Sequence, residues 1–165
     1  MLQTQGLFQR TFAHQKVAIF IGSLDKFFIK LPHLPKKVRI LINKIIPFFI
    51  LALGIISLIA TILSGFFLIL SILAWNTSIF FESIGSFLLI LLDTMFLLKA
   101  FKPLRNGDAI GWIYLFWAEI LEFINIVIRS INGEANVFFG ILTVLVSFYI
   151  LFEIGQFYVY KKISE

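Results

Sequence analysis

The chain has 165 residues, of which 60% are hydrophobic and only 14% are charged, and its mean hydropathy is +1.00. An ordinary soluble domain carries roughly 25% charged residues, so this composition excludes a water-soluble fold and predicts one compact membrane domain. The formal net charge is +5. Cysteine is absent from the sequence, which excludes disulfides, thiolate metal sites and thiol nucleophiles.

A basic segment occupies residues 1–44, with eight Lys and Arg residues against a single acid. A first helix is predicted over residues 17–30, broken at Gly22 and capped by Ser23. The next four residues, 32–35, begin and end with proline, which favours a stiff extended joint because each proline disfavours helix in the residue before it.

A second, basic amphipathic helix is predicted over residues 36–46, where apolar residues recur at positions 38, 41, 42 and 45. Its basic side chains come just before the first apolar span, so each is expected to add about 1 kcal/mol of attraction to anionic lipid headgroups. The predicted headgroup contacts are Lys36, Lys37, Arg39 and Lys44. Because apolar residues alternate with these basic ones, a membrane surface is the expected partner and nucleic acid is not.

Four apolar stretches in residues 45–162 are each long enough to cross a bilayer, which requires about 20 residues. The predicted spans are 47–75, 79–100, 109–131 and 135–160, with an inner loop over residues 99–108. If each crosses once, thirteen of the fourteen Lys and Arg residues lie on one side and only Arg129 lies on the other. Positive residues stay in the cytoplasm, so both termini are predicted to be cytoplasmic, in a bacterial cytoplasmic membrane.

Small and weakly polar residues form a stripe on each span, as expected where helices approach closely in lipid. The clearest stripe, on the first span, consists of Gly54, Ser57, Thr61, Ser64 and Gly65. On the second span the stripe includes Glu82, Gly85, Ser86 and Asp93. The predicted fold is therefore all-α: a polytopic four-helix transmembrane bundle with N-terminal amphipathic interfacial helices. A homo-oligomer and a complex with a partner membrane subunit both remain open.

Acidic residues within the spans are the candidates for chemistry, because a charge near the bilayer centre costs at least about 2.5 to 3.5 kcal/mol. At about 1.5 Å per residue, Asp93, Glu119 and Glu153, on three different helices, lie about 9 to 15 Å from the predicted inner ends of their spans. Carboxyl groups gathered there would hold protons or bind a cation. The candidate ion or proton site is Asp93, Glu119, Glu122 and Glu153, with Arg129 as a pairing partner for Glu122.

Sequence motifs of soluble and metal-dependent enzymes are lacking, including H-E-x-x-H, G-x-S-x-G and glycine-rich phosphate loops. No catalytic residue, metal ligand or cofactor is therefore predicted. Two functions are favoured ahead of a third, a membrane enzyme that acts on lipid. The first is a non-enzymatic structural or accessory membrane protein, and the second is a small proton- or cation-coupled transporter or channel that uses the intramembrane carboxylates.

Two stretches of the sequence are distinctive, residues 31–48, LPHLPKKVRILINKIIPF, and residues 111–116, GWIYLF. Both resemble segments of small four-span membrane proteins of reduced-genome, uncultured bacteria. The resemblance implies a four-span fold over most of the chain and no particular activity or site. Small multidrug exporters depend on a glutamate in the first span, which has no acid here, and four-span thiol oxidoreductases need cysteines.

Overall fold

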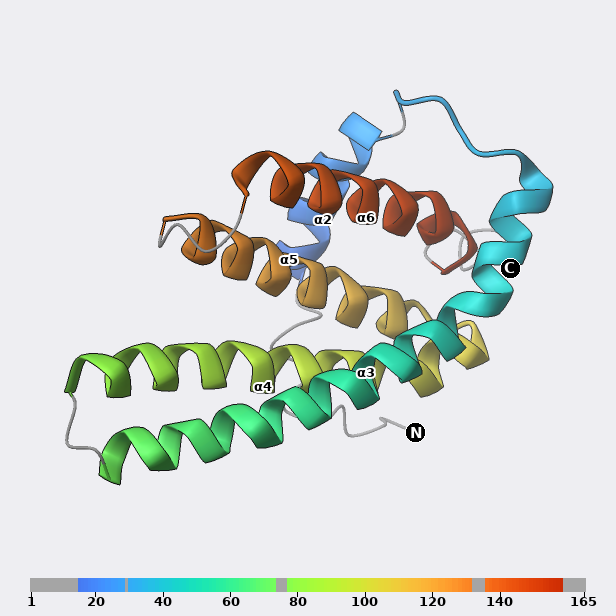
Figure 1. The fold of residues 1–165 in the computed structure, drawn as a ribbon. Coiled ribbons are helices and arrows are strands. Elements are labelled where there is room, and N and C mark those ends of the chain that lie inside the picture. Colours follow the sequence, from blue (N-terminus) through green and yellow to red (C-terminus); the bar gives the residue numbers. More distant parts are fainter. Residues whose placement is uncertain (1–14, 29, 74–76, 132–135, 159–165) are drawn as a thin grey trace.

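Five helices and no strand are present in the computed structural model, which describes residues 15–28, 30–73, 77–131 and 136–158 (Figure 1). Helices α3 to α6 are long and apolar enough to cross a membrane, as the sequence predicts. The helices are α2 (Gln15–Phe28), α3 (Lys36–Leu73), α4 (Thr77–Asn106), α5 (Ala109–Ile131) and α6 (Val137–Tyr158).

The span boundaries agree closely at α5, which begins and ends at the predicted residues. By contrast, α4 continues to Asn106, so most of the predicted loop over residues 99–108 is helical and that prediction is corrected. The predicted span ends at Trp75, residue 135 and Tyr160 lie outside the described residues.

Helix α3 is the largest departure from the expected boundaries. It runs unbroken for 38 residues through Pro47, so the predicted amphipathic helix over residues 36–46 and the first span are one element. Proline removes one backbone hydrogen bond and bends a helix without necessarily ending it. Figure 1 shows this bend between the cyan N-terminal part of α3 and its green remainder. At 1.5 Å per residue α3 is about 57 Å long, well beyond the roughly 30 Å of a hydrocarbon core.

The helices pack in chain order, α3 on α4, α4 on α5 and α5 on α6 (Figure 1). On α3, small residues make the first of these contacts possible: a Cβ at Gly54 would come within 2.9 Å of Leu98, and Gly65 faces Phe87. The predicted stripe on α3 is therefore a packing face. The N-terminal part of α3 then turns back to reach the C-terminal end of α6, which closes the bundle at this end.

Helix α2 crosses behind α5 and α6 and contacts both (Figure 1). Phe28 is buried and stacks on Phe152 with ring centroids 4.6 Å apart, while Phe20 meets the edge of Phe116 at 6.0 Å. The helix continues through Gly22, contrary to the predicted break. Ser23 does not cap a helix, since its hydroxyl donates to the carbonyl of Ile19, 3.1 Å away.

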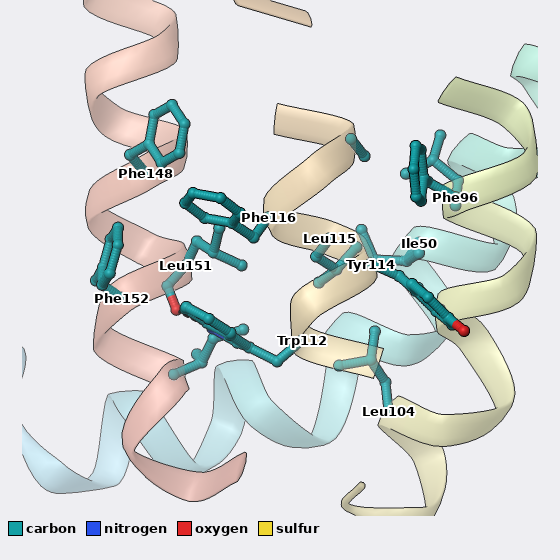
Figure 2. Close-up of a cluster of buried hydrophobic side chains, with 14 of the residues drawn as sticks. Ile50, Phe96, Leu104, Trp112, Tyr114, Leu115, Phe116, Phe148, Leu151 and Phe152 are labelled. Carbon is teal, nitrogen blue, oxygen red and sulfur yellow. Dashed lines mark hydrogen bonds between the residues drawn. The ribbon is translucent and has the colours of Figure 1, made fainter. Parts of the chain in front are cut away.

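A buried aromatic cluster joins α4, α5 and α6 at the end of the bundle where α4 leads into α5 (Figure 2). Trp112 and Phe116 point toward α6, whereas Tyr114 points toward α4 and packs on Phe96. The indole Nε1 of Trp112 donates to the carbonyl oxygen of Leu151 at 2.7 Å. This hydrogen bond satisfies the polar atom of a side chain that is only 2% exposed.

The turn between α4 and α5 is short and depends on one backbone conformation. Gly107 has φ +77°, which a side chain disfavours, and its N–H donates to the carbonyl of Leu104. The N–H of Asp108 donates to the carbonyl of Pro103. Because the chain reverses within two residues, Gly111 comes to lie directly against the end of α4.

The other end of the molecule is mostly apolar surface. Large residues on the outward faces of α3, α5 and α6 are more than one-third exposed, which suits contact with acyl chains. Examples are Phe66, Phe67, Leu73, Ile131 and Phe138.

Candidate functional site

Three of the four predicted acids come together between α4 and α5. Asp93 on α4 and Glu119 on α5 are partly buried, and Glu122 is exposed one helical turn further along α5. The charges of Asp93 and Glu119 each interact with that of Glu122, and Asp93 and Glu119 also interact with each other. The charges of these three residues are therefore near enough to interact, and the ion or proton site itself stays a prediction.

A chain of hydroxyl groups ends at Asp93. Ser57 Oγ on α3 donates to Asp93 Oδ2 at 3.2 Å and lies 2.7 Å from Thr94 Oγ1. Thr94 Oγ1 in turn lies 2.9 Å from Thr61 Oγ1. A hydroxyl has one proton, and the hydroxyls of Thr94 and Thr61 donate to the backbone carbonyls of Ile90 and Ser57, each at 2.8 Å. Ser57 is therefore the member of this hydroxyl group that donates to the carboxylate.

Contacts of Glu119 and Glu122 extend this polar region to α6 and along α5. The carboxyl group of Glu119 forms a side-chain hydrogen bond with Ser147 on α6. Glu122 Oε2 accepts a hydrogen bond from Asn125 Nδ2 at 3.4 Å. Polar groups of all four spanning helices thus meet around the carboxyls of Asp93 and Glu119. Within the described ranges, no three His, Asp or Glu side chains are grouped closely enough to hold a metal ion.

The fourth predicted acid, Glu153, lies in a different environment. Its side chain is only 3% exposed, and its carboxylate contacts the joint that precedes α3. Oε1 lies 2.6 Å from His33 Nδ1, and Oε2 accepts from the backbone N–H of Leu34 at 3.3 Å. Arg39 Nε is 3.6 Å from Oε2. The partners of Glu153 therefore come from residues 33–39.

This arrangement supplies a negative charge where α3 lacks one. The first turn of α3 contains no acid and begins with two lysines, which is unfavourable at the positive end of a helix dipole. The carboxylate of Glu153 compensates from α6. One turn earlier on α6, Tyr149 donates its hydroxyl to the carbonyl of Pro32. We call this set of contacts, made by Tyr149 and Glu153 with residues 32–39, the joint clamp.

The predicted headgroup contacts divide accordingly. Lys36, Lys37 and Lys44 are exposed, whereas Arg39 is partly buried against Glu153. Arg129, the predicted partner of Glu122, is exposed two turns further along α5. That pairing stays a prediction.

The joint clamp was not predicted from the sequence, although two signals for it exist. His33 lies between two prolines that hold the backbone extended, so its side chain is presented in a defined direction. Glu153 shares a helix face with Tyr149, away from the small-residue stripe of α6. Both signals indicate contact with something outside the four-span bundle.

Comparison of the chain with protein-family models, with curated proteins and with solved structures finds no match to any of them.

Proposed function

We propose that this chain is a non-enzymatic integral membrane protein, a structural or accessory component whose basic N-terminal part binds the inner membrane surface. Both termini face the cytoplasm in this proposal, and the partner of residues 30–46 is anionic lipid. The observation that supports it is the joint clamp. A basic segment fastened to α6 by a buried carboxylate is held at one level relative to the spans, unlike a free tail.

The depth of α2 also supports surface binding. Phe28 packs on α6 at Phe148 and Phe152, which are about 15 and 9 Å from Tyr158, the last residue of α6, at 1.5 Å per residue. Amphipathic helices at a membrane surface bury their apolar face about 5 to 10 Å deep. With Tyr158 at the inner surface, the contact of Phe28 with Phe152 falls within this depth and the contact with Phe148 lies a few ångströms deeper.

Hydrogen exchange of the full chain in lipid nanodiscs tests this proposal. We expect amides of residues 30–46 to exchange at least about tenfold more slowly in nanodiscs with anionic lipid than in zwitterionic ones, because each basic residue gains about 1 kcal/mol. In Glu153→Gln the carboxylate charge is lost, and we expect the difference between the two lipids to shrink.

Glu122→Gln is the matched control for that experiment, since it removes one carboxylate from an exposed position on α5. It should leave exchange in residues 30–46 unchanged. Equal exchange of wild-type protein in the two kinds of nanodisc would refute surface binding by this segment.

A second candidate, a small proton- or cation-coupled carrier, is favoured by the convergence of Asp93, Glu119 and Glu122. The charges of Asp93 on α4 and Glu119 on α5 interact with each other and with that of Glu122. The hydroxyl of Ser57 on α3 donates a hydrogen bond to Asp93 Oδ2. Four helices enclose little space, so a carrier of this kind would be expected to use more than one copy.

Proton release from protein in lipid vesicles distinguishes the two candidates. For a carrier, we expect the wild type to release protons well above about pH 4.3, the ordinary pKa of glutamate, and the Glu119→Gln/Glu122→Gln variant to lose this release together with any coupled flux. For a structural protein, the two titration curves coincide and the variant is as stable as the wild type or more stable, because burying a charge costs free energy.

A further inference from the structure

A cavity of about 590 Å³ opens where α3, the end of α4 and the end of α6 meet. Its walls are formed by residues 40–48 of α3, by residues 104–107 at the turn after α4, and by Phe157 and Tyr158 of α6. This volume is typical of sites for small organic ligands. The cavity shares none of the residues of the joint clamp.

The polar lining of the cavity suits an anion. Lys44 and Arg105 bring two positive charges from different helices, and no acidic side chain is among the described residues that line it. Asn106 and the hydroxyl of Tyr158 add groups that donate hydrogen bonds. A phosphate group needs this combination of fixed charge and several donors.

Asn43 adds a second side-chain amide to the lining, and an amide nitrogen can donate hydrogen bonds to phosphate oxygens. Headgroups of anionic glycerophospholipids such as phosphatidylglycerol present such a phosphate.

The remaining wall is apolar and continues onto the outside of the molecule. Phe48 lines the cavity and is itself 58% exposed, and its neighbours Phe49 and Ile45 are also exposed on α3. A free phosphate ion would leave this wall without a contact. An acyl chain would cover it and follow the lipid-facing side of α3.

We propose that this cavity binds the phosphate headgroup of an anionic phospholipid, with its acyl chains along α3 from Phe48 onward. The inference rests on the proposed function, because the orientation in that proposal directs the cavity toward the inner membrane surface. It adds a defined stoichiometric site, formed by Asn43, Lys44, Arg105 and Asn106, to the general attraction of the basic segment.

Native mass spectrometry of the delipidated full chain in detergent tests the site, with phosphatidylglycerol and phosphatidylcholine as the two probes. We expect one phosphatidylglycerol to bind per chain, and to bind more tightly than phosphatidylcholine. The Lys44→Gln/Arg105→Gln variant should bind phosphatidylglycerol about thirtyfold more weakly, since each cation near a lipid surface contributes about 1 kcal/mol, which is about fivefold in affinity.

Lys99→Gln/Lys102→Gln is the matched control, because it removes two exposed charges from α4 outside the cavity. It should change the affinity less than about twofold. Equal weakening in both double variants would overturn the defined site and leave the proposed function standing. Loss of surface binding in the nanodisc experiment, with the one-to-one lipid complex preserved, would refute the proposed function and leave the defined lipid site standing.

Two further arms keep the test decisive. Glycerol 3-phosphate carries the same phosphate without acyl chains, and binding as tight as that of the lipid would overturn lipid as the occupant. If the double variant fails to fold, Lys44→Arg is used instead. This variant preserves the charge and is expected to retain the one-to-one complex.

Discussion

Replacing Trp112 by alanine should lower the free energy of unfolding by about 3 to 5 kcal/mol, as for other buried tryptophans. The indole is 2% exposed, packs against Phe116 and Phe152, and donates its N–H to Leu151 (Figure 2). Truncation therefore removes the contacts of Trp112 with Leu151 and Phe152 of α6 and leaves a cavity in the aromatic cluster. Reversible unfolding in mixed detergent micelles, followed by circular dichroism, measures the loss.

The same substitution at Trp117 is the control, since this residue lies one turn and a half away and is only partly buried. Its cost should be less than half as large. Gly155 supplies a second check, because a Cβ there would lie 3.0 Å from the Trp112 indole nitrogen. Gly155→Ala should cost about 1 kcal/mol in the wild type and close to nothing in Trp112→Ala. Additive costs would contradict the assigned packing.

Gly111→Ala is expected to destabilise the protein by about 3 kcal/mol, a large effect for one methyl group. A Cβ at this position would lie 2.5 Å from the backbone nitrogen of Leu104 and 3.0 Å from the carbonyl carbon of Pro103. Backbone atoms cannot rotate away as a side chain does. The start of α5 must therefore separate from the end of α4, which also disturbs the turn at Gly107. The same unfolding measurement applies.

Gly85→Ala is the matched control for Gly111→Ala. It lies in α4, and no atom comes within 4 Å of a Cβ placed there. Alanine stabilises a helix relative to glycine by up to about 1 kcal/mol, so this variant should equal or exceed the wild type in stability. Similar stability of the two alanine variants would show that α4 and α5 are not in backbone contact at Gly111.

Hydropathy and residue size predicted those features of the fold that depend on one helix at a time. The four spans and the packing face of α3 at Gly54, Ser57 and Thr61 are examples. The corresponding prediction for α4 was wrong at Gly85 and Ser86, which are exposed, and right at Asp93. Small residues indicate a packing face on both α3 and α4. The sequence does not show over what length of that face the neighbouring helix stays in contact.

Pairings between distant segments could not be predicted in this way. His33 and Glu153 are 120 residues apart, and their contact depends on how far α3 extends before it bends at Pro47. A proline in an apolar run indicates a helix start and a helix bend equally well. Glu153 was grouped with the other acids because the sequence predicts how deep a residue lies in its span, but not which residues of other segments it contacts.

The unbroken course of α3 makes the protein sensitive to bilayer thickness. A thicker bilayer favours a more upright span and a thinner one a greater tilt, at a fraction of a kcal/mol for each ångström of mismatch. Since no loop separates the span from residues 36–46, any change in tilt must either open the bend at Pro47 or move these residues relative to α6. The joint clamp opposes the second movement. Strain from lipid of unsuitable chain length would therefore accumulate at Pro47.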